Sequence, residues 1–147
     1  MTIEKNKIIR VLFVCTGNAC RSQMAEAWAK KLKPDQMEVY SAGTHPAGFV
    51  SQRVIKVMHE VGIDMSEYWS KPVEQWEEVD FNVVITLCDY AKEACPVFPT
   101  QTRLFHYPFP DPMAILGNEE ATINAFRRAR DMIKEFVDTL PEALETS

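Results

Sequence analysis

The sequence predicts an α/β fold in which a four-stranded parallel sheet is flanked by helices on both faces. Three observations lead to this prediction. Segments with the pattern of strands alternate with segments of helical period along the chain. Residues 8–14 are apolar almost throughout, as expected of a central strand covered on both faces. With 147 residues the chain can build one such core but not two, so we expect a single domain over residues 1–147.

After this strand, the first half of the chain carries two helical patterns and one short strand. Apolar residues recur at helical spacing over residues 23–32, and a proline at position 34 stops that helix. Residues 37–41 are predicted to form the second strand, which an Ala-Gly pair ends. Over residues 50–61 the apolar positions are four, four and three apart, and Gly62 is expected to end this second helix.

The second half of the chain continues the alternation. Residues 64–78 are polar and aromatic, and we expect a loop there with a short helix at residues 73–76. Residues 81–87 are predicted to form the third strand, and residues 103–107 a weaker fourth strand. A long amphipathic helix is expected over residues 123–140, ending before a proline.

Composition restricts the classes of function. The net charge of −5 argues against a general nucleic-acid binder, although one local nest can still bind an anion. The first ten residues contain no signal-peptide core, and no apolar run approaches the roughly 20 residues of a membrane span. We therefore expect a cytoplasmic protein without membrane association. Four cysteines in such a chain indicate catalysis or metal binding rather than structural disulfides.

The loop between the first strand and the first helix has the composition of an anion site. Cys15 ends the strand, five residues follow, and Arg21 and Ser22 open the helix. The backbone N–H groups of such a loop can turn inward as a nest, and the helix adds its positive dipole end. Arg21 offers a guanidinium fork suited to a tetrahedral oxyanion, and the same field favours the nucleophilic thiolate form of Cys15. The predicted oxyanion loop comprises Cys15, Thr16, Gly17, Asn18, Ala19, Cys20, Arg21 and Ser22.

This Cys-x5-Arg-Ser loop, with Asn18 inside it and an Asp-Pro pair far downstream, resembles the low-molecular-weight protein tyrosine phosphatase family. That family includes the thioredoxin-coupled arsenate reductases. The resemblance covers nearly the whole chain and implies the phosphotyrosine phosphatase I fold. It also implies that Asp111, which precedes Pro112 in a proline-rich loop, is the general acid. The tyrosines that clasp the substrate ring in the phosphatases are missing after Asp111, which favours a small inorganic oxyanion.

Residues within the loop receive roles from the same resemblance. Asn18 is expected to hold the loop shape, because asparagine tolerates left-handed backbone angles. Ser22 is expected to donate its hydroxyl to the Cys15 thiolate while also capping the helix. Cys20 is expected to be structural, and oxidation together with Cys15 is the alternative. Some family members bind potassium near the loop through a carboxylate whose position matches Lys71 here, so a potassium site is in doubt.

A second cysteine pair, Cys88 and Cys95, follows the third predicted strand at a spacing of seven residues. The spacing does not fit a zinc site and no histidine is near, so two buried thiols without a catalytic role remain one interpretation. The pair also looks like the redox segment of the thioredoxin-coupled arsenate reductases. That resemblance implies a relay: Cys15 attacks arsenate, Cys88 attacks the Cys15 sulfur, and Cys95 then forms a Cys88–Cys95 disulfide.

The sequence therefore predicts an enzyme that reduces arsenate to arsenite, with phosphate or sulfate as competing oxyanions. Thioredoxin is the expected reductant, and we expect no tightly bound cofactor, no metal site and a monomer. One alternative is a phosphatase that hydrolyses phosphomonoesters through a Cys15 phosphocysteine. Another is an oxyanion- or redox-sensing module without turnover. The three histidines, His45, His59 and His106, lack ligand spacing and are expected to be surface or core residues.

Overall fold

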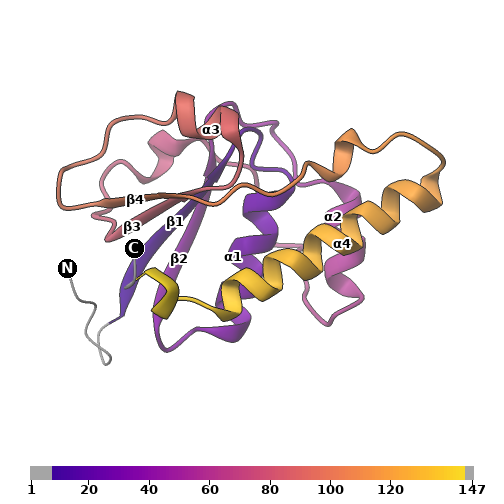
Figure 1. Ribbon diagram of the computed structural model, residues 1–147, viewed down its shortest axis with the longest axis horizontal. Helices are drawn as coiled ribbons and strands as arrows, with labels where there is room; N and C mark the ends of the chain where they lie inside the picture. Colours follow the sequence, from indigo (N-terminus) through magenta and orange to yellow (C-terminus); the bar gives the residue numbers. More distant parts are fainter. Residues whose placement is uncertain (1–7, 145–147) are drawn as a thin grey trace.

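Four strands form one parallel sheet in the order β2-β1-β3-β4 in the computed structural model, which describes residues 8–144 (Figure 1). They are β1 (Ile9–Cys15), β2 (Met37–Gly43), β3 (Val83–Thr86) and β4 (Arg103–His106). The four strands are those predicted from the sequence, with some ends shifted by one or two residues. β1 pairs with β2 on one side and with β3 on the other, so it is central, as its continuous apolar run indicates.

Helices cover both faces of this sheet, which confirms the predicted fold class. On one face lie α1 (Arg21–Leu32), α2 (Gln52–His59) and α4 (Glu119–Asp138), and α4 packs on both other helices. On the other face lie the short α3 (Asp89–Ala94) and the 3₁₀ helix η1 (Val73–Trp76). α4 begins four residues before its first expected apolar position, because Asn118 caps it with an acceptor side chain.

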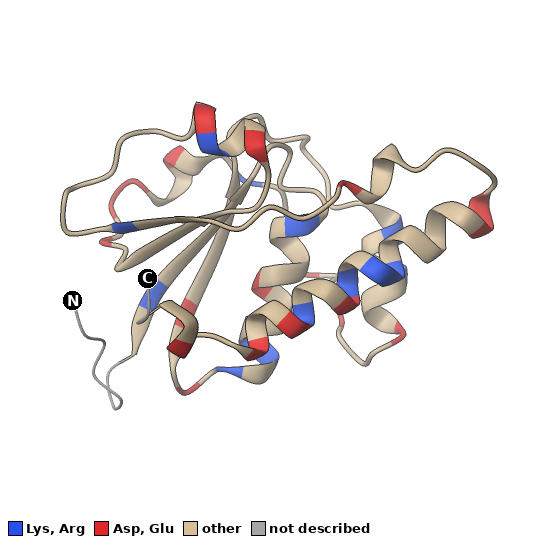
Figure 2. Cartoon of the chain, viewed as in Figure 1, with Lys and Arg blue, Asp and Glu red and all other residues tan. Residues whose placement is uncertain are grey.

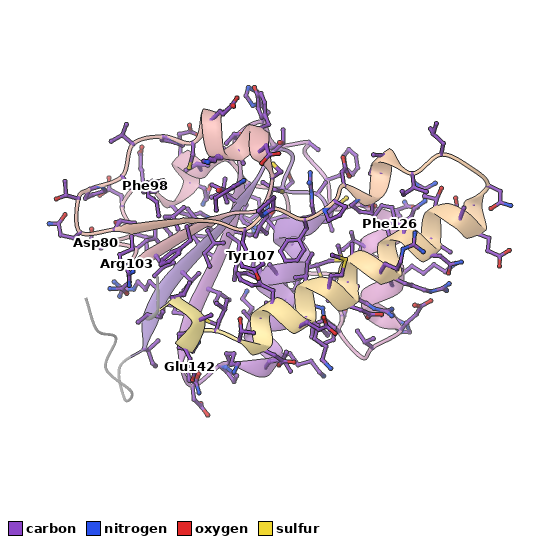
Figure 3. The ribbon with its side chains drawn as sticks, in the orientation of Figure 1. Asp80, Phe98, Arg103, Tyr107, Phe126 and Glu142 are labelled. Carbon is purple, nitrogen blue, oxygen red and sulfur yellow. The ribbon has the colours of Figure 1, made fainter. Side chains whose placement is uncertain are left out.

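The alternation of side chains along β1 explains the two cores. Val11 and Phe13 are fully buried among residues of α1, α2 and α4. Leu12 and Val14 point the opposite way and are fully buried in the smaller core beneath α3 and η1. On the α4 side, Tyr107, which follows β4, stacks on an aromatic ring of α4 with centroids 4.1 Å apart (Figure 3).

Charged residues of both signs are interspersed along α4 (Figure 2). Two of them connect this helix to α2: Arg127 and Arg130 both bind Glu60, with N–O distances of 2.6 and 2.9 Å. These contacts hold the Glu60 carboxyl well below its ordinary pKa, at about 2. Among the described residues, no helix combines the length and apolar composition that crossing a membrane requires.

The strand order places one sheet edge in a position to bind ligands. After β1 the chain moves to one side for β2 and then returns to the other side for β3. The carboxyl ends of β1 and β3 therefore lie next to each other where the order reverses, and ligands bind at such positions in parallel α/β sheets. The segments that follow β1, β3 and β4 all emerge at this edge.

Candidate active site

Four of the five residues expected to be catalytic lie at this edge. Cys15 is the last residue of β1, Cys88 follows β3 closely, and Asp111 lies in the loop after β4. The Cys88 sulfur is 3.2 Å from the Thr16 hydroxyl oxygen, next to Cys15 in the chain. An Arg21 guanidinium nitrogen is 4.0 Å from an Asp111 carboxylate oxygen. The structure thus brings these three segments into contact. The fifth residue, Cys95, lies at the far end of α3 from Cys88.

The backbone of the oxyanion loop is fixed from outside through its carbonyl groups. Four of them accept hydrogen bonds from N–H groups of the segment after β2. These bonds join Thr44 to Cys15, His45 to Thr16, Ala47 to Gly17 and Ser51 to Ala19, at 2.8–3.1 Å. Within residues 8–144, the backbone N–H groups of residues 16–20 donate no hydrogen bond to a protein acceptor. A loop whose carbonyl groups bond outward leaves its N–H groups to an anion, as a nest requires.

Two residues allow the loop to take this shape. Asn18 has φ of 49°, in the left-handed region, and its amide donates to the hydroxyls of Ser22 (2.7 Å) and Ser41 (3.0 Å). Gly43, the last residue of β2, lies directly against the loop. A Cβ at this position would be 2.6 Å from the Thr16 carbonyl oxygen, so only glycine fits without a shift of the backbone.

The Cys15 sulfur is almost fully buried and lies 2.8 Å from the Ser22 hydroxyl oxygen. Because the Asn18 amide already donates to this hydroxyl, the Ser22 proton is available to a Cys15 thiolate. The expectation that Ser22 also caps α1 is wrong. The helix begins at Arg21, the cap position is Cys20, and no side chain caps it. The first N–H groups of α1 are therefore left without a side-chain acceptor at the cap.

Arg21 joins the oxyanion loop to the loop that carries Asp111. Its guanidinium donates to the Phe109 carbonyl oxygen at 3.0 Å and approaches Asp111 with a second nitrogen. The other Asp111 oxygen accepts from the Met113 N–H at 2.9 Å and caps a short 3₁₀ helix, η2 (Pro112–Ala114). The Asp111 side chain is 45% exposed, so it can exchange protons with solvent after each reaction.

All four cysteines are free thiols, and they differ in environment. Burial, followed by the neighbouring Cys15, raises the pKa of Cys20 to about 12, which suits a structural thiol. Burial also raises the pKa of Cys95 to about 11. Cys95 is partly buried against the smaller core, in the stretch of residues 88–102 that we call the redox segment. Its thiol is thus protected from ionisation while α3 is folded.

Lys71 is a buried cation beneath the oxyanion loop. Its ammonium donates to the Trp69 carbonyl oxygen at 2.8 Å and lies 3.7 Å from a Glu26 carboxylate oxygen. Burial lowers the pKa of Lys71, while Glu26 acts in the opposite direction. The Lys71 ammonium therefore faces the buried Glu26 carboxylate, which compensates its charge. Within residues 8–144, no cluster of three or more His, Cys, Asp or Glu side chains could hold a metal ion.

Sequence reasoning missed two residues that shape the loop. Gln23 is fully buried, and its amide donates to the backbone and side-chain oxygens of Asn18 and to the Trp69 carbonyl. The sequence predicts for Gly43 only that it ends a strand. The polar Gln23 within the apolar helical pattern was the one signal available, since a buried amide needs partners. The residues next to Gly43 in the sequence give no signal of its role, because the backbone atoms that a side chain there would meet belong to the oxyanion loop.

Comparison with known proteins gives one family. The model of the low molecular weight phosphotyrosine protein phosphatase family matches residues 10–147. An arsenate reductase from Halalkalibacterium halodurans is 42% identical over 132 residues, which cover 90% of this chain and 94% of that protein.

Solved structures agree with the family match. A structure described as an arsenate reductase in oxidized state has a TM-score of 0.74 and 35% identity, covering 89% of this chain and 95% of the other. An arginine phosphatase from Geobacillus stearothermophilus has a TM-score of 0.73 and 29% identity, covering 94% of each chain. The chain is therefore similar both to reductases and to a phosphatase of the same fold.

Proposed function

The chain belongs to the low molecular weight phosphotyrosine protein phosphatase family, and we propose that it acts within that family as an arsenate reductase. The observation that carries this proposal is the contact of 3.2 Å between the Cys88 sulfur and the Thr16 hydroxyl oxygen. A second thiol at the edge of an oxyanion loop has no task in phosphate hydrolysis, but it is needed when the bound element is to be reduced. The similarity to arsenate reductases supports the same function.

The first step uses the fixed part of the site. The loop N–H groups and Arg21 bind arsenate, a tetrahedral anion, with the Cys15 sulfur beneath it. The Cys15 thiolate attacks arsenic, so that an S–As bond forms and an As–O bond breaks. Asp111, as general acid, gives its proton to the departing oxygen. The Ser22 hydroxyl, 2.8 Å from the sulfur, stabilises the thiolate before the attack.

The second step reduces arsenic. The Cys88 thiolate attacks the Cys15 sulfur; an S–S bond forms, the S–As bond breaks, and its electron pair stays on arsenic. Arsenic(V) thereby becomes arsenic(III) and leaves as arsenite. The product is a Cys15–Cys88 disulfide, and the neighbouring Thr16 hydroxyl holds the Cys88 sulfur near its target before the step.

The third step restores Cys15. The Cys95 thiolate attacks the Cys88 sulfur, Cys15 leaves as a thiolate, and a Cys88–Cys95 disulfide remains. The two cysteines lie at opposite ends of α3, and seven residues of helix span about 10 Å. Since disulfide geometry requires Cα atoms within about 7 Å, α3 must unwind for this bond to form.

We assign the final reduction to thioredoxin, a dithiol protein that can take over the Cys88–Cys95 disulfide by the same exchange chemistry. The reaction belongs in the cytoplasm, where thiols are kept reduced, and the protein acts as a monomer without a tightly bound cofactor. Phosphate and sulfate bind the same nest as competing anions, because they share the tetrahedral shape and negative charge of arsenate.

Phosphatase activity is the second candidate function. The contact of Arg21 with Asp111 at 4.0 Å gives the site an acid beside the anion, and the arginine phosphatase neighbour has the same fold. Because thiols do not reduce phosphorus(V), a phosphocysteine on Cys15 can be released only by water. This activity needs neither Cys88 nor Cys95.

The test is arsenate-dependent NADPH consumption with thioredoxin and thioredoxin reductase. The wild type should turn over, and Cys88→Ser should abolish turnover. Cys95→Ser is the matched comparison: it should release one arsenite per protein and stop as a Cys15–Cys88 disulfide, which mass spectrometry detects. If Cys88→Ser and Cys95→Ser both hydrolyse an aryl phosphate like the wild type and no protein consumes arsenate, the phosphatase assignment replaces the reductase.

A further inference from the structure

The first turn of α3 is held from two sides by histidines that the steps above do not use. On the β4 side, the His106 Nε2 lies 2.8 Å from an Asp89 carboxylate oxygen, and its Nδ1 lies 2.8 Å from the Thr86 hydroxyl oxygen. On the opposite side, the His45 ring contacts the Tyr90 ring, with centroids 5.4 Å apart. Asp89 and Tyr90 are the two residues that directly follow Cys88.

The hydrogen bonds of His106 hold in either protonation state. An ionised carboxylate only accepts, so Nε2 carries the proton that points to Asp89. The Thr86 hydroxyl can donate to Nδ1 when the ring is neutral and accept from it when the ring is charged. His106 therefore links the end of β3 to the first residue of α3 without depending on its charge. We call the set of Thr86, His106 and Asp89 the clasp.

The remainder of the redox segment is attached differently. Among the described residues, no side chain of residues 92–101 makes a hydrogen bond or an ion pair with the rest of the chain. Val97 is 99% exposed, and Cys95 and Phe98 are held only by partial burial against the smaller core. The attachments of α3 are thus concentrated at its Cys88 end.

We propose that His106 and Asp89 are positioning residues of the relay: through the clasp they hold Cys88 beside Cys15 while the Cys95 end of α3 unwinds. The proposal rests on the reductase function proposed above. It follows from the order of the steps, because Cys88 must stay near Cys15 to attack its sulfur and is then approached by Cys95. A helix anchored at its first turn opens from its other end, so the fixed thiol is Cys88 and the moving thiol is Cys95.

The test isolates the step that the clasp serves. In a Cys95→Ser background, arsenate should convert the protein to the Cys15–Cys88 disulfide, and rapid alkylation followed by mass spectrometry gives the rate. His106→Ala or Asp89→Ala should slow this conversion about three- to fivefold, the effect of losing the exposed polar contact between the two side chains. The double variant should be no slower than His106→Ala, because both substitutions remove the same contact between positions 106 and 89.

Two controls separate positioning from general damage. His106→Gln should restore most of the rate, since its amide nitrogen can still donate to Asp89. Lys92→Ala, on the exposed part of the same helix, should leave the rate unchanged. Phosphate affinity, measured by calorimetry, should be the same in the His106→Ala, Asp89→Ala and unsubstituted proteins. A loss of phosphate affinity equal to the loss of rate would overturn the proposal, because it would show a distorted oxyanion loop.

The outcomes distinguish the positioning role of the clasp from the proposed reductase function. If the disulfide forms at one rate in all variants, the clasp has no positioning role, while the reductase function stands. If arsenate produces no Cys15–Cys88 disulfide even with the clasp intact, the reductase function fails, and the role given to His106 and Asp89 fails with it. Slowing in His106→Ala and Asp89→Ala with recovery in His106→Gln supports the proposal.

Discussion

The oxyanion loop and the redox segment meet at the contact between Thr16 and Cys88, yet the two are fixed in different ways. The loop is bonded along its length through its carbonyl groups, and buried amides of Asn18 and Gln23 hold it from within. The redox segment is anchored at its Cys88 end by the clasp and at its other end by Thr102, whose hydroxyl donates to the Phe81 carbonyl oxygen. Between these ends, Cys95 and Phe98 are held by partial burial against the smaller core. The difference matches the tasks we assign to each: an anion nest must be preorganised, whereas a thiol relay must move.

The largest effect is expected at Asp111, the general acid that lies beside the oxyanion loop. Asp111→Asn removes the proton that we assign to the departing oxygen but keeps a side chain that can accept from the Met113 N–H. Formation of the arsenate-dependent Cys15–Cys88 disulfide should slow about a hundredfold or more. Phosphate affinity should change little, because Asp111 is a proton donor rather than a member of the nest. Equal losses in both measurements would remove Asp111 as the acid.

The state of the redox segment can be tested through the reactivity of the Cys95 thiol. Burial raises its pKa to about 11, so at pH 7–9 the thiol is protonated and only a small thiolate fraction reacts. Alkylation of Cys95 in the reduced protein should therefore rise about tenfold per pH unit over this range. In urea the ordinary thiol pKa returns, and the rate at pH 8 should increase. A rise that already flattens between pH 8 and 9 would indicate the ordinary thiol pKa of about 8.5 and would mean that α3 is already open.

The fold could be predicted from the sequence because its signals are local. The four strands and the helices α1, α2 and α4 are each marked by their own apolar period, and the Cys-x5-Arg-Ser loop lies within eight consecutive residues. The short helix α3 carries no such period and was not predicted. The contacts that shape the site are not local. Gly43 is set by atoms of Thr16, and His106 finds its role only when β4 places it beside Asp89. A histidine without ligand spacing gives no sequence signal for such a contact.

The failed expectation for Ser22 has the same origin. A serine at the start of a helix normally predicts a cap, because its hydroxyl accepts from the backbone. Here Asn18 turns its amide toward that hydroxyl, which then faces the Cys15 sulfur instead. The capping rule fails here because the Ser22 hydroxyl makes contacts that exist only in the folded loop.

Gly43→Ala should distort the oxyanion loop, although Gly43 itself lies on the neighbouring strand β2. The added Cβ would lie 2.6 Å from the Thr16 carbonyl oxygen and 2.9 Å from the Asn18 nitrogen, both backbone atoms. Overpacking of this kind costs about 1–3 kcal/mol, so phosphate affinity should fall about tenfold. Gly17→Ala is the matched control within the loop, since its Cβ would come no closer than 3.6 Å to the Ala47 Cβ. A larger loss in Gly17→Ala than in Gly43→Ala would contradict this account.

The smallest effect is expected in the redox segment, on the rate at which the Cys88–Cys95 disulfide forms. Whether this rate rises or falls is more informative than the size of the change. Glu93 is exposed near the Cys95 end of α3, and glycine there weakens the helix by about 0.5–1 kcal/mol relative to alanine. If α3 must unwind for Cys95 to reach Cys88, Glu93→Gly should form the Cys88–Cys95 disulfide about two- to fivefold faster than Glu93→Ala, with equal rates of Cys15–Cys88 formation. Stopped-flow mixing with arsenate, followed by alkylation and mass spectrometry, separates the two disulfides. A slower second step in Glu93→Gly would show instead that the folded helix guides Cys95 to its target, and the redox segment would then be preorganised like the loop beside it.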